Sequence, residues 1–200
     1  MSFTDCIKQV HRLFSCLVAI KLHGHFNHTA IAQQEKAMST PAHQDAISLL
    51  EADHREAEDL FAQYEKAKDA EKTEEKFEIA RKVCAALLIH MQVEETIFYP
   101  AARAALDEEG DDLLNEAEVE HNGAKDLIKQ LGETKPDDPM FDAKVKVLSE
   151  QIEHHVDEEE NELFPKLKKT DLDLDSLGDE MAQAKEDLKE QLKAWRYSGS

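Results

Sequence analysis

The chain has 200 residues, 41% of them hydrophobic, with only 6 glycines and 5 prolines, a composition typical of one helical domain with a substantial core. Its formal net charge of −20 argues against proteins that bind nucleic acid or an anionic membrane surface, because both would be repelled. Three cysteines are too few for a disulfide framework and favour a reducing compartment.

Residues 1–43 lack the dense Glu and Lys patterning that follows, and we expect them to form an N-terminal extension, either disordered or a mis-assigned gene start. The apolar run at 13–20 is too short to cross a bilayer and is followed at once by Lys21, so it predicts neither a membrane span nor a signal peptide. We therefore expect a cytoplasmic protein. A short histidine-rich tract in this stretch is a weak metal signal and comprises His23, His25 and His28.

Residues 44–170 show the three-and-four spacing of apolar side chains that predicts amphipathic helices. The first helix should run to about residue 68, and the second from near Thr73 to an end or kink around Pro100. A turn rich in Pro and Asp at 135–139 separates the third helix from the fourth.

Glycines and a further apolar stripe complete this outline. Gly110 is expected at the break between the two halves, and Gly132 at the C-terminal cap of the third helix. Residues 171–200 predict a fifth helix with Ser176 as its N-cap. Its leucine stripe and Trp195 are expected to pack on the bundle, although dimerisation through this helix is an alternative.

The two halves of the 44–170 region repeat each other. A shift of 67 residues places the apolar stripe of the first helix, with His54, on that of the third, with His121. A shift of 65 residues places the second helix, with His90, on the fourth, with His155. Two matched helical hairpins predict an all-α fold, an up-and-down antiparallel four-helix bundle with pseudo-twofold symmetry.

Each of the four helices carries one histidine in phase with its apolar stripe, and two of these histidines begin a His-x-x-x-Glu. The two motifs are His90 to Glu94 and His155 to Glu159, and a proline follows each histidine by ten residues. On an α-helix, residues four apart lie about 40° and roughly 6 Å from each other, so an imidazole and a carboxylate converge on one point. That is the geometry of a metal site.

Each single signal has a simpler explanation. A lone histidine on an apolar face is usually a satisfied core residue, and the spacing of His54 and Glu58 fits a surface pair. Four histidines at matching places of a repeat favour a shared layer. His155 continues the apolar stripe of its helix, whereas His154 lies on a polar face, and Cys84 is expected in the core.

The predicted ligand set is His54, His90, Glu94, His121, His155 and Glu159. Burying the two carboxylates without a cation would be unfavourable, and nitrogen and oxygen donors suit iron, manganese or zinc. Six ligands in a helical bundle favour a dinuclear centre with carboxylate bridges. Glu51 and Glu118, three residues before the first and third histidines, could add ligands or hydrogen bonds, or could equally be solvated acids.

With these residues the chain resembles the hemerythrin HHE cation-binding family over 45–169. The resemblance rests on Asp53-His54-Arg55, His90-x-x-x-Glu94, Glu120-His121 and His155-x-x-x-Glu159-x5-Pro165. It implies a hemerythrin-like bundle that holds two non-haem iron ions, oxo- or hydroxo-bridged, on the six predicted ligands, with Glu94 and Glu159 as the bridges. Zinc and manganese are the alternative metals.

The chain departs from the family's oxygen carriers, which have a further histidine one turn from the third-helix ligand. Ala117 and Lys125 occupy the corresponding places. The resemblance therefore implies a more open centre that binds or reacts with dioxygen, nitric oxide or peroxide, in sensing, detoxification or stress response. Whether the protein is an enzyme is left open.

Two other functions compete with this reading: storage or buffering of iron or zinc without redox chemistry, and a structural bundle with core histidines. The expected partner is a small diatomic ligand or peroxide, with neither nucleic acid nor membrane. The chain itself should be a monomer or a weak homodimer.

Overall fold

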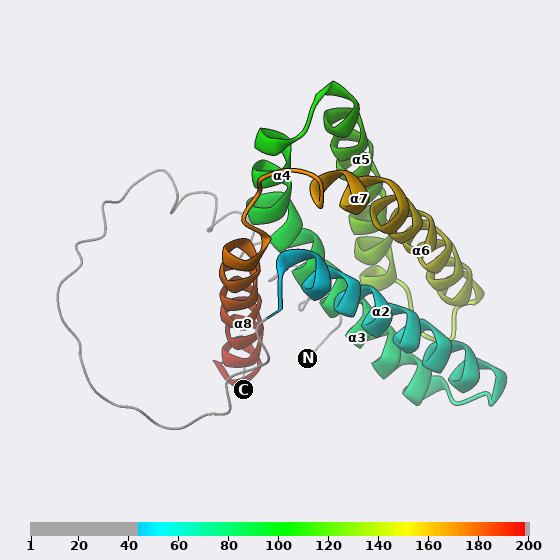
Figure 1. The fold of residues 1–200 in the computed structure, drawn as a ribbon. Helices are drawn as coiled ribbons and strands as arrows, with labels where there is room; N and C mark the ends of the chain where they lie inside the picture. Colours follow the sequence, from blue (N-terminus) through cyan, green and yellow to red (C-terminus); the bar gives the residue numbers. More distant parts are fainter. Residues whose placement is uncertain (1–43, 199–200) are drawn as a thin grey trace.

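The computed structural model describes residues 44–198, so the predictions for residues 1–43 and for the Trp195 side chain lie outside the described part. Within it the chain is helical and without strands, which confirms the predicted all-α bundle. Figure 1 shows two antiparallel hairpins, α2 with α3 and α5 with α6, and α8 standing beside the first hairpin. The α-helices in order are α2 (Ala46–Asp69), α3 (Thr73–Val93), α4 (Tyr99–Ala105), α5 (Glu108–Glu133), α6 (Pro139–Glu158), α7 (Phe164–Leu167) and α8 (Leu174–Ser198).

Aspartates fix where four of these helices begin, and the fourth of them, α8, is described below. The carboxylate of Asp45 accepts a hydrogen bond from the backbone N–H of Ser48 at 2.9 Å, and Asp107 and Asp138 cap α5 and α6 in the same way. The first hairpin turns through Glu71, whose φ of 56° is the positive-φ backbone that closes the turn between α2 and α3. The predicted ends of the first helix and start of the second agree with these bounds to within a residue or two.

Three residues that were predicted to lie at helix ends do not lie there. Gly110 lies in the first turn of α5, since the break between the halves comes at Asp107, and Gly132 lies inside α5, which continues to Glu133. Ser176 is not the cap of α8, because its own N–H donates to the carboxylate of Asp173 at 3.0 Å. An acidic side chain just before the helix serves the first-turn N–H groups better than a serine within it.

The second helix does not end at Pro100, as the sequence left open, but passes through one π-helical turn, η1 (Glu94–Phe98), and continues as α4. Within η1 the N–H of Tyr99 donates to the carbonyl of Glu94, five residues back. Proline has no N–H and its ring crowds the preceding turn, so a widened turn lets the helix carry Pro100 without breaking.

The fourth helix repeats this feature. The π-helical turn η2 (Glu159–Leu163) precedes Pro165, and the helix continues as α7. Both π turns begin at the glutamate of a His-x-x-x-Glu motif, and such turns are frequent at functional sites. The ten-residue distance from histidine to proline therefore accompanies a π-helical turn in both halves of the chain.

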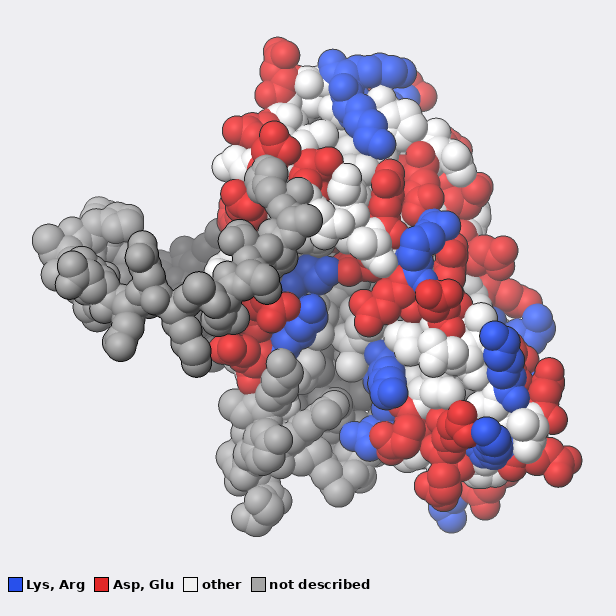
Figure 2. All heavy atoms as spheres, turned by 60° about the horizontal axis from the view of Figure 1, so that its bottom comes forward, with Lys and Arg blue, Asp and Glu red and all other residues white. Residues whose placement is uncertain are grey.

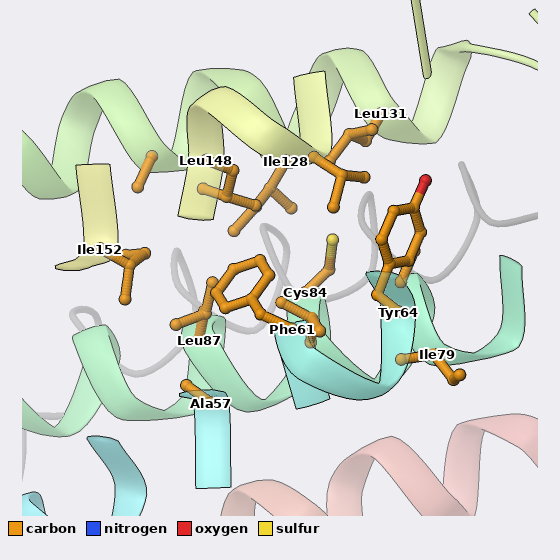
Figure 3. Close-up of a cluster of buried hydrophobic side chains, with 14 of the residues drawn as sticks. Ala57, Phe61, Tyr64, Ile79, Cys84, Leu87, Ile128, Leu131, Leu148 and Ile152 are labelled. Carbon is orange, nitrogen blue, oxygen red and sulfur yellow. The ribbon is translucent and has the colours of Figure 1, made fainter. Parts of the chain in front are cut away.

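Two apolar clusters fill the bundle, one on each side of the polar layer that contains the four histidines. Figure 3 shows the first cluster, in which Phe61 and Tyr64 of α2 face Leu148 and Ile152 of α6, with Cys84 among them. Cys84 is thus a core residue, as predicted. Burial of one such large side chain stabilises a fold by roughly 1.5–3 kcal/mol.

Helix α8 packs on α2 and α3 outside the four-helix bundle, as the leucine stripe predicted. Leu177, Met181 and Leu188 are buried against the second cluster. Gly178 allows the close approach, because a Cβ there would lie 2.4 Å from the backbone oxygen of Gln44. Only glycine fits at this contact without a shift of the backbone.

The surface carries the acidic excess of the sequence. Figure 2 shows Asp and Glu spread over one face, with Lys and Arg placed between them rather than gathered apart. Among the residues that the structure describes, every helix is too short or too polar to cross a lipid bilayer.

Candidate metal centre

Four imidazoles, one from each long helix of the bundle, meet in the buried layer between the two apolar clusters. His54 on α2 and His90 on α3 have ring centroids 5.0 Å apart, and those of His121 on α5 and His155 on α6 are 4.7 Å apart. All four side chains are buried. The three-and-four spacing that places each histidine on the apolar stripe of its helix also places it in this layer.

Two carboxylates occupy the space between these pairs. Glu94 lies 3.1 Å from His90 Nε2 and 3.4 Å from His121 Nε2 through its Oε2 atom. Glu159 lies 3.3 Å from His54 Nε2 and 3.7 Å from His155 Nε2. Each glutamate thus touches one histidine from each half of the chain. The six predicted residues are therefore brought together around one centre.

The outer nitrogen of every histidine, Nδ1, lies against a carboxylate from another helix. Within the hairpins the distances are 3.2 Å from Asp53 to His90 and 2.9 Å from Glu120 to His155. Because a carboxylate only accepts, each Nδ1 donates its proton outward, and the Nε2 of the neutral ring turns a lone pair to the centre. This is how carboxylates orient histidines that ligate metals.

The other two outer carboxylates come from the opposite hairpin. Glu160 accepts from Nδ1 of His54 at 2.8 Å, and Glu95 accepts from Nδ1 of His121 at 2.9 Å. Each of these glutamates follows directly after a central glutamate, so the π turn that places the inner carboxylate places the outer one as well. The four outer contacts obey the same pseudo-twofold symmetry as the sequence.

Cationic side chains support three of the outer carboxylates. Arg55 bonds to Glu160 at 2.6 Å, Lys125 pairs with Glu95, and Lys185 of α8 pairs with Asp53. The fourth, Glu120, has His154 at 3.5 Å, in an exposed cluster with Glu158. Burial opposes ionisation of Asp53 and Glu95, but the contacts of Asp53 with His90 and Lys185, and of Glu95 with His121 and Lys125, outweigh it and lower the pKa of both carboxyl groups.

Several buried polar atoms at the centre lack a hydrogen-bond partner, as expected of atoms that bind a cation. Both oxygens of Glu94, Oε2 of Glu159 and Nε2 of His54 are buried without a hydrogen-bond partner. Nε2 of His121 and Nε2 of His155 face each other at 3.1 Å, each as a lone pair when its Nδ1 is protonated. Buried carboxylates and opposed lone pairs are stable together when a positive ion lies between them.

The acidity of these groups reflects the crowding of charge. Burial raises the pKa of Glu94 well above its usual value, and the neighbouring charge of Glu159 raises it further. Burial acts on Glu159 in the same sense, but the imidazoles of His155 and His54 outweigh it and hold its pKa low. Burial lowers the pKa of His90 to about 4 and so keeps this ring neutral, the form that binds a metal.

Tyr99 is a further polar residue at the centre. Its hydroxyl donates to Glu159 Oε1 at 3.0 Å and lies 3.3 Å from His121 Nε2. Burial and the two central glutamates raise the pKa of this phenol well above its usual value, so the hydroxyl keeps its proton. The centre therefore contains a hydrogen-bond donor that the sequence analysis did not identify.

Other sequence candidates lie away from the centre. Glu51 and Glu118 are half-exposed and pair with Lys168 and Arg103, which agrees with the reading of solvated acids. Glu58 is exposed and pairs with Arg55, not with the buried His54, so the surface pair expected of His54 and Glu58 was wrong. His154 is exposed while His155 is buried, so the choice between the two agrees with the structure.

Sequence reasoning missed the role of the four outer carboxylates, although the repeat contains the signal. An acidic residue stands directly before His54 and His121, and a second glutamate follows Glu94 and Glu159. Corresponding acids that flank corresponding ligands in both halves could have been recognised as one conserved feature of the repeat. Lys125, named only as a substitute for a histidine, proves to be the cation on Glu95.

Comparison with known proteins agrees with this geometry. The family model for the hemerythrin HHE cation binding domain matches residues 45–167, which covers α2 through α7. A DNA nickase from a Nostoc species is 31% identical over 121 residues, which make up 60% of this chain and 32% of the nickase. The match thus spans about a third of that protein's length.

Two mycobacterial proteins extend the comparison. An uncharacterized protein of Mycobacterium tuberculosis is 29% identical over 120 residues, 58% of this chain and 71% of that protein. The crystal structure of a hemerythrin HHE cation binding domain-containing protein from Mycobacterium kansasii is similar at a TM-score of 0.60. It is 23% identical, and the match covers 77% of this chain and 91% of that chain, so the likeness concerns the fold.

Proposed function

The chain belongs to the hemerythrin HHE cation-binding domain family, and from this membership we propose that it is a non-haem di-iron protein. Its buried centre binds or reacts with dioxygen, nitric oxide or peroxide, and serves sensing, detoxification or stress response. The observation that carries the proposal is the set of unsatisfied polar atoms at the centre, which belong to Glu94, Glu159 and His54.

The proposed ligands divide into two groups that share a carboxylate. One group comprises His54, His90, Glu94 and Glu159, and the other comprises Glu94, His121 and His155. Two ions bridged by carboxylates fit this division. The donor set has imidazole and carboxylate but no thiolate, which suits iron and is less suited to a structural zinc site.

Bound iron would supply reversible electron transfer and strong polarisation of a small ligand. The chain's own residues have three further tasks. The outer carboxylates hold the imidazoles in the ligating tautomer, the apolar clusters pack on both sides of the centre, and Tyr99 presents a protonated hydroxyl, 3.0 Å from Glu159, that can donate a hydrogen bond to a bound ligand.

The open coordination favours reaction over reversible carriage. Four histidines and two glutamates would leave further positions open on two bound ions, and the hydroxyl of Tyr99 lies beside this site, 3.3 Å from His121 Nε2. Ala117 and Lys125 take the places at which oxygen carriers have a fifth histidine, and Lys125 is turned to Glu95 instead. We therefore propose sensing or detoxification for this centre.

Cutting of DNA is not part of the proposal. The similarity to the nickase spans about a third of that protein, and a formal net charge of −20 repels a polyanion. The family model, by contrast, matches residues 45–167, the segment that contains the candidate metal centre.

The test begins with elemental analysis of the purified chain, followed by anaerobic loading with Fe(II) and exposure to dioxygen, nitric oxide or hydrogen peroxide. We expect about two iron ions per chain, a visible absorption band after oxidation and consumption of peroxide. His54→Ala should lower the iron content, whereas Gln130→Ala, at an exposed position near the C-terminal end of α5, should not. A colourless, zinc-filled chain would favour storage or buffering, and a stable reversible dioxygen adduct without peroxide turnover would favour a carrier.

A further inference from the structure

A pocket of about 530 Å³ lies between α2, α3, α6 and α8 and reaches the candidate metal centre. Three of the four central histidines, His54, His90 and His155, belong to its lining. One water molecule takes up on the order of 30 Å³, and a diatomic ligand needs little more. Pockets for organic ligands have volumes of roughly 300–1,000 Å³, so this pocket is sized for a molecule much larger than dioxygen.

The wall next to the histidines is apolar and built partly from very short side chains. Three alanines leave open the space that longer side chains would fill at this level of the hairpin. The apolar lining includes Ala57, Ala85, Ala86, Leu87, Ile152 and Val156. A ligand that occupies this part of the pocket must therefore have an apolar body.

The charged lining has a sign opposite to that of the chain as a whole. Four cationic side chains line the pocket, against three carboxylates, whereas the whole chain has 24 basic and 44 acidic residues. Two of the cations are already engaged, Lys185 with Asp53 and Arg81 with Glu78. Lys82 is exposed, and Lys189 has only an exposed contact with Glu186, which contributes little, so both are available to an anionic group.

We propose that this pocket binds an organic anion with an apolar body, which is a substrate or effector of the metal centre. The role as substrate or effector rests on the function proposed above. The anionic group lies at Lys82 and Lys189, and the apolar body lies against the alanines and points to His54 and His90. The centre then acts on, or responds to, an organic molecule in addition to a small oxidant.

The first test uses octanoate as the probe and octylammonium as its cationic counterpart, measured by calorimetry on the full chain after removal of metal. Octanoate should bind at least tenfold more tightly than octylammonium. The double variant Lys82→Gln/Lys189→Gln should lose about tenfold in octanoate affinity. The control Lys129→Gln/Lys146→Gln removes the same charge from exposed positions outside the pocket and should bind as the wild type does.

The second test fills the pocket. Ala86→Phe should abolish octanoate binding while metal content and thermal midpoint stay at wild-type values, and Ala104→Phe, at an exposed position on α4, should change none of these. Equal binding of octanoate and octylammonium, or undiminished octanoate binding by the Lys82/Lys189 variant, would overturn the inference. The octanoate titrations need no metal. A chain that binds octanoate but no iron therefore overturns the proposed function alone, and a chain that binds iron but no octanoate overturns only the pocket.

Discussion

His54 on α2 is oriented by Glu160, which stands 106 residues further along the chain and accepts the Nδ1 proton at 2.8 Å. The reciprocal contact, from Glu95 to His121, also joins the two hairpins. By contrast, Asp53 orients His90 and Glu120 orients His155, in each case a histidine of the same hairpin. Half of the outer contacts thus depend on correct docking of one hairpin on the other.

Replacing Glu160 by Gln should lower metal affinity about 10–100-fold, because an amide is a weaker acceptor for the His54 proton and no longer fixes the ligating tautomer. The measurement is a competition titration against a chelator of known affinity. Glu58→Gln is the matched control, since Glu58 also pairs with Arg55 but does not contact His54. Equal affinities for the two variants would contradict an orienting role for Glu160.

Replacing Glu94 by Gln should have opposite effects on stability and on metal binding. Both carboxylate oxygens of Glu94 are buried and unpartnered, so the neutral amide should stabilise the metal-free chain by about 1–2 kcal/mol. Loss of the shared carboxylate should at the same time remove at least one metal ion per chain. Urea unfolding with chelator present and elemental analysis measure the two effects. Glu118→Gln, at a half-exposed site, should change neither.

The ion pair beneath Tyr64 predicts a pH-dependent stability that does not involve the metal centre. Asp142 accepts from the Tyr64 hydroxyl at 2.5 Å and from Lys76 at 2.6 Å. Burial opposes ionisation of this carboxyl, but the hydrogen bonds from Lys76 and Tyr64 outweigh it, so its pKa lies below the unfolded value of 3.8. The stabilisation is therefore fully present above that value and is lost as the pH falls through the lower folded pKa.

Asp142→Asn should accordingly destabilise the chain by about 1–3 kcal/mol at neutral pH, because Lys76 is left buried without its counter-charge. The difference from wild type should shrink steadily as the pH is lowered below the unfolded value. Unfolding in urea across this pH range, in the presence of chelator, measures it. Asp126→Asn, at an exposed site, serves as the control, and a destabilisation independent of pH would show that the ion pair is not responsible.

Core packing in the cluster of Figure 3 should affect stability without affecting the metal centre. Leu148 is fully buried, and Leu148→Ala should destabilise the chain by about 2–5 kcal/mol. Its neighbour Val147 is 44% exposed, and Val147→Ala should change stability by less than about 0.5 kcal/mol. Metal content per folded chain should stay the same in both variants. A loss of metal in the Leu148 variant would mean that the two regions are coupled.

The periodicity of the apolar residues predicted the bundle, because residues that recur every 3.6 positions lie on one face of an α-helix. It also placed the six central residues, since each lies in phase with buried neighbours such as Leu87 and Ile152. Their role as ligands stays a prediction. The π turns could not be predicted in this way. Pro100 indicates that the regular helix is disturbed, but a helix that ends and a helix that forms a π turn contain the same proline signal.

The outer carboxylates were harder to predict because 44 acidic residues offer an acid near every ligand. The residues considered, Glu51 and Glu118, stand three positions before a histidine. Two of the four contacts come instead from Asp53 and Glu120, one position before a histidine, and the other two from Glu95 and Glu160, one position after a central glutamate. A step of one residue turns a side chain by about 100°, away from the core axis and to the neighbouring helix. Which neighbour stands there depends on how the helices pack, and that is a property of the folded chain.

The exchange of carboxylates between the hairpins bears on how such a protein could arise. A single hairpin contains two imidazoles, one inner acid and one satisfied outer contact, but its remaining acid reaches outward to a histidine that it does not itself possess. Two copies of one hairpin, related by a twofold axis, would make all four contacts. Gene duplication and fusion of a self-associating helix pair would therefore yield this architecture in one step, with the second copy free to diverge, as the difference between Arg55 and Asn122 at equivalent positions illustrates.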